Sequence, residues 1–232
     1  MKVALIVVDL QEDFLPPKGS LAIQDGRSII PLINKLAMDY PWSSVVATQD
    51  WHPVNHTSFA SQHNVEPFTE LEFKHPLGKL DDNTLQVITK SQMVWPNHCI
   101  ENTSGACLDP TFLATFNLIP ANVDKVFIQK GMLQDREYYL CFQDCWNLHH
   151  TKLHDYLIKL NITDVVFVGL AYDYCVYNSA KDCATLNFNT FVVKSCCKSV
   201  APESIDQTDK LYQKAGITIL KSVEEVANIF NK

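Results

Sequence analysis

Three side chains that could carry out nucleophilic chemistry stand at the ends of apolar runs: Asp9, Lys130 and Cys175. The runs over 3–9 and 126–129, and the one that begins at Asp164, have the Val-rich character of strands in a parallel sheet. Because the carboxyl ends of parallel strands lie along one edge, we expect the three side chains to converge. A carboxylate there can take the proton of a thiol, and an ammonium can stabilise the resulting thiolate.

Cys175 is expected at a turn between a strand and a helix, because residues 176–186 have helical spacing. The positive end of the helix macrodipole at such a turn predicts a lowered thiol pKa. Each of the three residues also has a plainer explanation when taken alone. A buried Cys is commonly a small apolar core residue, a strand-end Asp commonly caps a turn, and a strand-end Lys is commonly a solvated charge. Their expected convergence favours the catalytic interpretation.

A second group of residues has the types and spacing of a metal site. Asp50 and His52 are two apart in an extended segment, so their side chains point the same way, and His98 adds an imidazole from a long loop. One carboxylate and two imidazoles leave positions open for water or substrate, as in catalytic metal sites. Zn²⁺ is the first expectation, with Fe²⁺ and Mn²⁺ as alternatives, and Ser58 could reach the ion through a water. The other imidazoles considered as ligands are expected at the surface, namely His56, His63 and His75.

The rest of the chain alternates strands with helices, which predicts an α/β fold with a parallel sheet and helices on both faces. Further strands are expected at 44–48, 191–193 and 217–220, and further helices at 28–38, 153–159, 203–214 and 223–230. From Val54 to about Pro120 the composition is polar and irregular, and so long a loop region is usually functional. We expect a single domain over residues 1–232, with a metal-binding loop region over about 50–120.

Composition narrows the class of protein. The 232 residues are 47% hydrophobic, enough for a large core, and the formal charge of −7 argues against nucleic acid or an anionic membrane as the main partner. No apolar run is long enough to span a membrane, and the one at the N-terminus is too short for a signal peptide. The eight cysteines, with no paired motif, are expected to stay reduced, Cys196 and Cys197 being structural. A cytoplasmic location is expected, with the nucleus or the peroxisome as alternatives.

Five short motifs are spread over nearly the whole chain, in this order: Asp9-Leu-Gln-Glu-Asp-Phe14, Asp50-Trp-His-Pro53, Trp95-Pro-Asn-His98, Lys130-Gly131 and Gly169-Leu-Ala-Tyr-Asp-Tyr-Cys175. Together they resemble the nicotinamidases of the isochorismatase-like hydrolase family. Two further stretches look most like the fungal members, Gly19-Ser20-Leu21 and Asp135-Arg-Glu-Tyr-Tyr139. The resemblance implies a three-layer α/β sandwich around a central six-stranded parallel sheet.

The resemblance also implies roles for individual residues. The catalytic triad would be Asp9, Lys130 and Cys175, and the zinc ligands would be Asp50, His52 and His98. A cis peptide is implied between Leu170 and Ala171, and an oxyanion hole in the backbone amides of Ala171 and Cys175. Three positions depart from the family pattern without removing a catalytic group: Glu12 in place of Asn, Asp173 in place of Glu, and Tyr172 in place of Thr or Leu.

The implied activity is that of an amidohydrolase, which converts nicotinamide to nicotinate and ammonia through a Cys175 thioester and so feeds NAD salvage. Pyrazinamide is expected as a further substrate. Phe14, Trp95 and Tyr174 are expected to wall the substrate ring, because aromatic faces stack well on an aromatic ligand. Two alternatives stay open: a sister amidase acting on another small amide, which would not need the metal ligands, and a catalytically inactive zinc-binding scaffold. The expected partner is the small-molecule substrate, and a homo-oligomer is compatible with the sequence.

Overall fold

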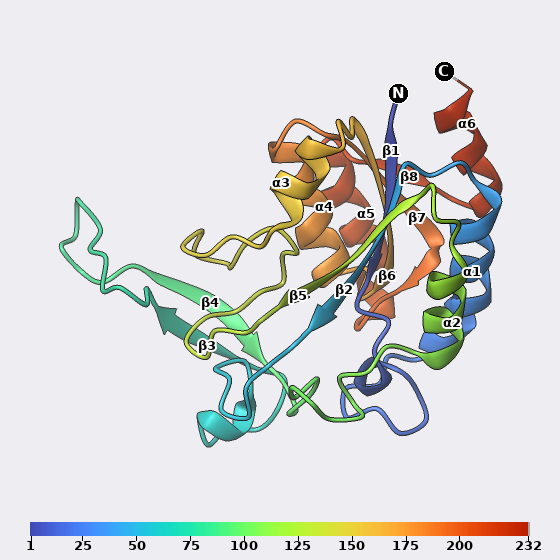
Figure 1. The fold of residues 1–232 in the computed structure, drawn as a ribbon. Helices are drawn as coiled ribbons and strands as arrows, with labels where there is room; N and C mark the ends of the chain where they lie inside the picture. The colour runs from blue at the N-terminus through green and yellow to red at the C-terminus, as the bar shows by residue number, and fades with distance from the viewer. Residues whose placement is uncertain (232) are drawn as a thin grey trace.

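A six-stranded parallel sheet forms the centre of the computed structural model, which describes residues 1–231 (Figure 1). Its strands run in the order β5-β2-β1-β6-β7-β8. Their bounds are Val3–Val8 (β1), Ser44–Asp50 (β2), Asp124–Lys130 (β5), Asp164–Leu170 (β6), Asn189–Lys198 (β7) and Thr218–Leu220 (β8). Every neighbouring pair is parallel, which confirms the sheet expected from the sequence.

The two central strands, β1 and β6, are buried along their whole length. Side chains of β1 alternate between two apolar cores, with Val3, Leu5 and Val7 in one and Ala4, Ile6 and Val8 in the other. A strand that faces a core on both sides needs apolar residues at every position. This requirement explains why both strands appear in the sequence as continuous apolar runs.

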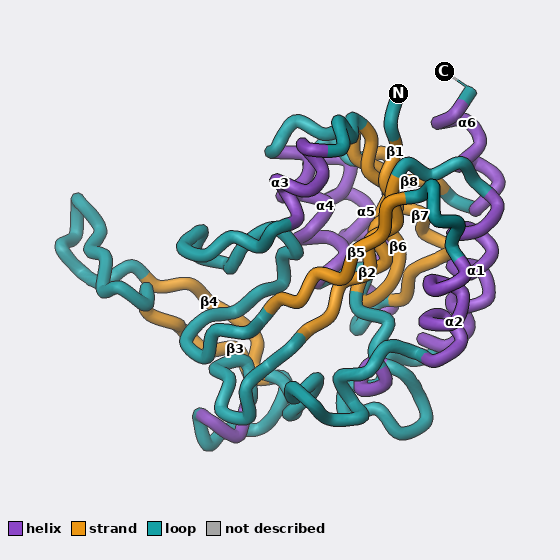
Figure 2. Tube along the Cα trace, in the orientation of Figure 1, coloured by secondary structure: helices purple, strands orange, loops and turns teal. Residues whose placement is uncertain are grey.

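Helices cover both faces of the sheet and make the three layers (Figures 1 and 2). One face carries α1 (Ile30–Asp39), α2 (Pro110–Leu118) and α6 (Ala227–Phe230), and the other carries α3 (Leu153–Lys159), α4 (Cys175–Thr185) and α5 (Ile205–Lys214). Short 3₁₀ turns precede three of these helices, at Gly26–Ile29, Pro202–Ser204 and Val223–Val226. No helix among residues 1–231 combines the length and the apolar character that crossing a membrane requires.

The expectation of an irregular region from Val54 to about Pro120 is wrong in two places. An antiparallel hairpin of β3 (Thr69–Lys74) and β4 (Thr89–Val94) projects from the body of the molecule, and α2 begins at Pro110. The hairpin lies outside the main sheet, so it is built largely from polar residues and its composition resembles that of a loop. The start of α2 has a recognisable signal, since the Asp109 carboxylate accepts from two backbone N–H groups of its first turn and Pro110 follows.

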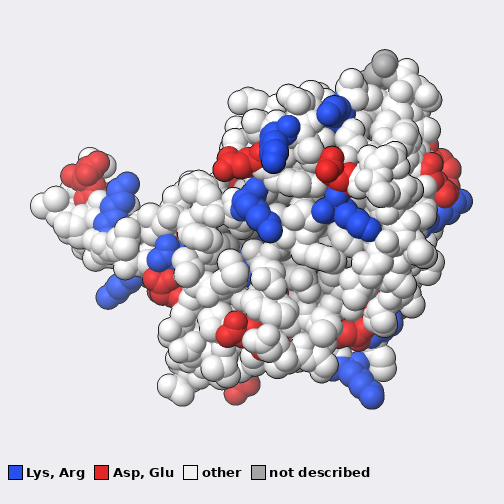
Figure 3. Space-filling model, in the orientation of Figure 1, with Lys and Arg blue, Asp and Glu red and all other residues white. Residues whose placement is uncertain are grey.

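The other predicted strands and helices are confirmed, with shifts at their ends. β2 continues to Asp50 and β7 to Lys198, so both strands reach further toward the carboxyl edge than their apolar parts suggest. All eight cysteines are free thiols, and Cys196 and Cys197 are buried in β7, as a structural role requires. Acidic and basic side chains are interspersed over the face shown in Figure 3.

Candidate active site and metal site

The carboxyl ends of β1, β5 and β6 bring Asp9, Lys130 and Cys175 together. Lys130 Nζ lies 2.9 Å from Asp9 Oδ2 and 3.6 Å from Cys175 Sγ, and a carboxylate oxygen of Asp9 lies within 4.8 Å of that sulfur. Asp9 and Lys130 are fully buried, while Cys175 is 8% exposed. The three side chains therefore converge as expected, and their catalytic roles stay a prediction.

Local structure explains how each side chain reaches this point. Asp9 comes directly after β1 with a φ of +50°, Lys130 is the last residue of β5, and Cys175 is the first residue of α4. Parallel pairing places Lys130 beside Asp50, the last residue of β2. The Leu170–Ala171 peptide is cis, as the family resemblance implied. The proposed oxyanion role of the Ala171 amide stays a prediction.

Lys130 is the buried counter-charge of two buried carboxylates. Its Nζ donates to Asp50 Oδ1 at 2.5 Å and to the Tyr138 carbonyl at 3.1 Å, in addition to the contacts with Asp9 and Cys175. Burial alone would lower the pKa of Lys130, but Asp50 and Asp9 raise it well above its ordinary value. Lys130 is therefore a permanent cation at neutral pH.

The expectation of a lowered pKa for Cys175 is wrong. Burial raises the pKa of this thiol well above its ordinary value, and the nearby Lys130 ammonium offsets only part of the effect. Burial likewise raises the pKa of Asp9, against the opposing influence of Lys130. Cys175 is consequently a thiol at rest beside a carboxylate of raised basicity, an arrangement in which a proton can leave the sulfur as the sulfur attacks.

Asp50, His52 and His98 form a compact set of donors. One oxygen or nitrogen from each lies within 4.8 Å of the others, and all three side chains are buried. His52 Nδ1 lies 2.9 Å from the Gly131 carbonyl, and His98 Nδ1 lies 2.7 Å from the Pro96 carbonyl. A carbonyl can only accept, so each Nδ1 carries a hydrogen and each Nε2 is the ring atom available to a metal ion.

These three residues fit a divalent metal ion by two observations. His52 Nε2 is buried and has no hydrogen-bond partner among residues 1–231, and Asp50 Oδ2 lies 3.6 Å from it. Burial lowers the pKa of His98 to about 4, with His52 contributing, so this imidazole is neutral as a ligand must be. Two imidazoles and one carboxylate leave coordination positions open.

Two imidazoles expected at the surface are buried instead. His56 is fully buried and stacks on His52 with ring centroids 4.0 Å apart, and His75 is 8% exposed against Trp146. His63 is half-buried, with Nε2 on the Thr57 carbonyl. The long loops fold back over the sheet edge and over each other, which polar composition alone does not reveal. Ser58 bonds to His56 through its hydroxyl, and its expected contact with the ion through water stays a prediction.

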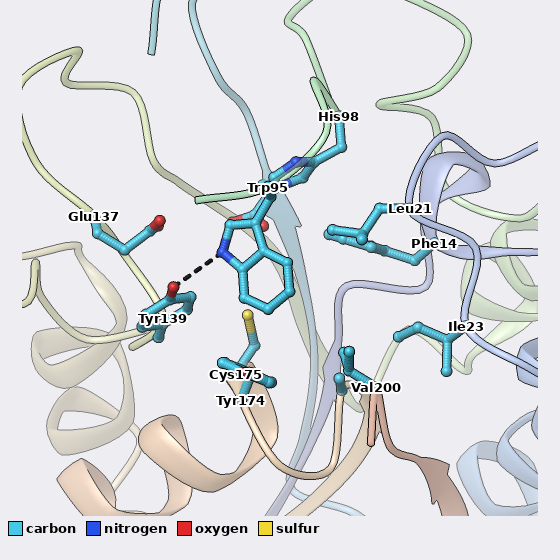
Figure 4. Close-up of a pocket in the computed structure, with 12 residues that line it drawn as sticks. Phe14, Leu21, Ile23, Trp95, His98, Glu137, Tyr139, Tyr174, Cys175 and Val200 are labelled. Carbon is cyan, nitrogen blue, oxygen red and sulfur yellow. Dashed lines mark hydrogen bonds between the residues drawn. The ribbon is translucent and has the colours of Figure 1, made fainter. Parts of the chain in front are cut away.

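A pocket containing about 410 Å³ of space not filled by atoms, part of it open to solvent, lies above Cys175 (Figure 4). Its wall includes all three aromatic residues expected there, Phe14, Trp95 and Tyr174. The rings of Trp95 and Tyr174 meet edge to face with centroids 4.8 Å apart. In Figure 4 the Cys175 thiol points toward the space that these rings enclose, with the His98 imidazole at its far side.

Sequence reasoning missed several residues of the pocket: Leu21, Ile23, Glu137, Tyr139 and Val200. Tyr139 accepts a hydrogen bond of 3.0 Å from Trp95 Nε1, and burial raises the pKa of the Glu137 carboxyl. The stretch that contains Glu137 and Tyr139 was noted only for its likeness to fungal sequences. The three apolar residues carry no chemical signal, because only the folded chain brings them to the pocket.

The side chains of the three positions that depart from the family pattern are occupied elsewhere, and none lines the pocket formed by the described residues. Glu12 pairs with Arg27 at 2.5 Å, and the Tyr172 hydroxyl donates to Asp209 at 2.7 Å. The Asp173 carboxylate accepts from the backbone N–H groups of Val200 and Ala201. None of these three side chains therefore contributes to the lining of this pocket.

Gly131 packs closely against His52 of the candidate metal site, so a larger residue there should reduce metal binding. Its φ is +76°, and a Cβ added there would lie 2.3 Å from Cε1 of His52. Gly131→Ala should therefore displace the His52 ring and reduce the metal bound per chain, as measured by elemental analysis of the purified protein.

Gly216→Ala is the matched control for this prediction. Its φ is +74°, so the backbone cost of roughly 1–2 kcal/mol is shared, but a Cβ there meets nothing within 4 Å. Gly216→Ala should lower the melting temperature and keep the metal. Equal metal content in the two variants would show that Gly131 does not hold His52.

Known proteins resemble this chain in sequence and in structure. The isochorismatase domain matches residues 139–222. The nicotinamidase of Saccharomyces cerevisiae is 35% identical over 227 residues, covering 93% of this chain and 98% of that protein. The structure of the yeast nicotinamidase bound to the inhibitor nicotinaldehyde superposes with a TM-score of 0.85 at 33% identity, covering 94% of this chain and 99% of the other.

A pyrazinamidase of Pyrococcus horikoshii solved in complex with zinc has a TM-score of 0.70 at 28% identity, covering 95% of this chain and 99% of the other. The likeness in sequence and in structure extends over almost the whole chain, as the order of its motifs predicted. The chain therefore belongs to the isochorismatase family of hydrolases, among its nicotinamidases.

Proposed function

We propose that this protein hydrolyses nicotinamide to nicotinate and ammonia, feeds NAD salvage, and also accepts pyrazinamide. The observation that carries the proposal is the position of the Cys175 thiol, with Asp9 and Lys130 beside it, at the floor of an aromatic pocket that also holds His98 of the metal site. Relatives named for these two activities support the proposal.

Acyl transfer through a thioester follows from this arrangement. Asp9 takes the proton of the Cys175 thiol while the sulfur attacks the carboxamide carbon. The backbone amides of Ala171 and Cys175 stabilise the oxyanion, by roughly 3 kcal/mol per donor in comparable sites. Asp9 then gives its proton to the departing ammonia. Water, deprotonated by Asp9, hydrolyses the thioester, and nicotinate leaves with the thiol restored.

Lys130 and the aromatic wall prepare these steps. The ammonium lies within contact distance of both the base and the nucleophile, so it stabilises negative charge on the sulfur as the proton leaves. Phe14, Trp95 and Tyr174 hold the substrate ring and exclude water from the reacting carbonyl. The need for a reduced Cys175 suits a reducing compartment such as the cytoplasm.

A metal ion, for which Zn²⁺ is the proposed identity, would be held by Asp50, His52 and His98. When bound it supplies a Lewis acid that can coordinate a pyridine nitrogen. The zinc complex of the Pyrococcus horikoshii protein supports this identity. Fe²⁺ and Mn²⁺ remain the alternatives, because two imidazoles and a carboxylate suit all three ions.

Ammonia and nicotinate release by the purified protein tests the function against the two alternatives. A nicotinamidase should form both products in equal amounts and should lose activity when a chelator removes the ion. A sister amidase would leave nicotinamide intact and turn over another small amide. An inactive scaffold would bind metal and release no ammonia from either substrate.

Metal ligands should discriminate between substrates with and without a ring nitrogen. His98→Ala should lower kcat/KM for nicotinamide by at least about 10-fold more than for benzamide, because only nicotinamide offers a nitrogen to the ion. Elemental analysis should show about one ion per chain in the wild type and a marked loss in the variant. His154→Ala, on the exposed side of α3, should change neither quantity. Equal losses for the two amides would mean that the ion does not contact the ring.

A further inference from the structure

The proposed base, Asp9, has two carboxylate oxygens in different environments. Oδ1 accepts a hydrogen bond of 2.5 Å from the Thr48 hydroxyl. Oδ2 lies 2.9 Å from Lys130 Nζ as an ion pair and has no hydrogen-bond partner among residues 1–231. Both side chains are fully buried.

The Thr48 hydroxyl forms two hydrogen bonds with Asp9, one as acceptor and one as donor. It accepts from the backbone N–H of Asp9 at 3.2 Å while it donates to the carboxylate of the same residue. An ionised carboxylate can only accept, so the hydroxyl hydrogen points to Oδ1. Thr48 thereby bridges the main chain and the side chain of Asp9 and restricts rotation of the carboxylate.

Lys130 explains why the second oxygen stays open. An ammonium has three hydrogens, and those of Lys130 go to Asp50 Oδ1, the Tyr138 carbonyl and Cys175 Sγ. A carboxylate free to rotate would compete for the hydrogen that faces the sulfur. The bond from Thr48 holds Oδ1 and so limits this competition, and Oδ2 faces the same Lys130 ammonium that contacts the Cys175 sulfur.

Strand geometry places Thr48 for this task. It lies in β2 two residues before Asp50, so the two side chains are on the same face of the strand. Pairing of Val7 with Ala47 brings the end of β1 alongside Thr48. Thr48 follows the apolar residues 45–47 of β2, and its hydroxyl bonds to both the backbone and the side chain of Asp9.

We propose that Thr48 is a positioning residue that selects Oδ2 of Asp9 as the oxygen that takes the proton from Cys175. The selection acts on the proton transfer and leaves the substrate-binding wall and the metal ligands untouched. The inference depends on the proposed role of Asp9 as the base.

Two pairs of variants isolate the hydroxyl. Thr48→Val replaces it by a methyl group of similar size, and Thr48→Ser and Thr48→Ala differ from each other only in the hydroxyl. We expect Thr48→Val and Thr48→Ala to lower kcat for nicotinamide by about 10- to 100-fold, and both the wild type and Thr48→Ser serve as the reference for this loss. KM should change by less than about 3-fold. Thr48→Ser should stay within about 3-fold of the wild type.

Metal content and melting temperature complete the test, because Thr48 is close to Asp50 in the chain. The ion bound per chain should be the same in all variants, and kcat is compared below the lowest melting temperature. Equal kcat within either folded pair, or a loss of kcat that follows loss of the ion, would overturn the inference. Should Thr48→Val not fold, the Ser and Ala pair decides.

Asp9→Asn separates this inference from the mechanism on which it depends. We expect that variant to be inactive. An inactive Asp9→Asn together with matched kcat values in both Thr48 pairs would remove the role of Thr48 and keep Asp9 as the base. An active Asp9→Asn would remove the base itself, and the role of Thr48 with it.

Discussion

Cys175→Ala should reduce nicotinate formation by at least about 10³-fold, the scale of loss seen when a covalent nucleophile is removed. The fold should persist, because the Cys175 side chain is small and lines the pocket. Chromatographic measurement of nicotinate, with circular dichroism to monitor folding, checks both expectations.

Cys183→Ala is the matched control, since it removes a buried thiol from the same helix, α4, away from the pocket. It should keep most of the activity and lose stability through the small cavity that it leaves. Turnover by Cys175→Ala above a few per cent of the wild-type rate would rule out the thioester route.

Lys130→Met should have the second largest effect. Loss of the ammonium leaves Asp9 and Asp50 buried without their shared cation, and removal of one partner of a buried ion pair typically costs about 3–5 kcal/mol of folding free energy. The rate should fall by roughly 10²-fold or more, because the charge that stabilises the emerging thiolate is gone. Lys130 lowers the pKa of Cys175 against the effect of burial, so iodoacetamide should alkylate the variant more slowly at a fixed pH.

Lys214→Met, at the exposed end of α5, provides the comparison for removal of one positive charge from the protein. It should match the wild type in rate and in alkylation. A Lys130→Met protein that keeps both properties would show that Lys130 only balances the charge of the carboxylates in the folded state.

The sheet could be predicted from the sequence because its central strands face a core on both sides. Their continuous apolar runs, such as 3–8 and 165–168, are typical of strands buried on both faces of a sheet. The convergence of Asp9, Lys130 and Cys175 followed from parallel pairing alone. The β3–β4 hairpin was not predicted, because a two-stranded element outside the core needs few apolar residues and has no continuous run.

The site was predictable only in part. Asp50, His52 and His98 carry their chemistry in their residue types, whereas Tyr139 and Val200 become pocket residues only when distant loops meet. The folded chain removes His56 and Cys175 from water, and this burial raises the pKa of Cys175. No local sequence pattern encodes this burial. Thr48 was missed for the same reason, since its partner is 39 residues away.

A covalent intermediate on Cys175 is the central step of the proposed mechanism. To detect it directly, purified protein is mixed with a comparable concentration of nicotinamide and the reaction is quenched with acid at short times. The mass of the peptide that contains Cys175 is then determined by mass spectrometry. We expect a nicotinoyl group on that peptide that appears with the release of ammonia and disappears as nicotinate forms. Release of both products together, with the Cys175 peptide unmodified at every time point, would contradict the account.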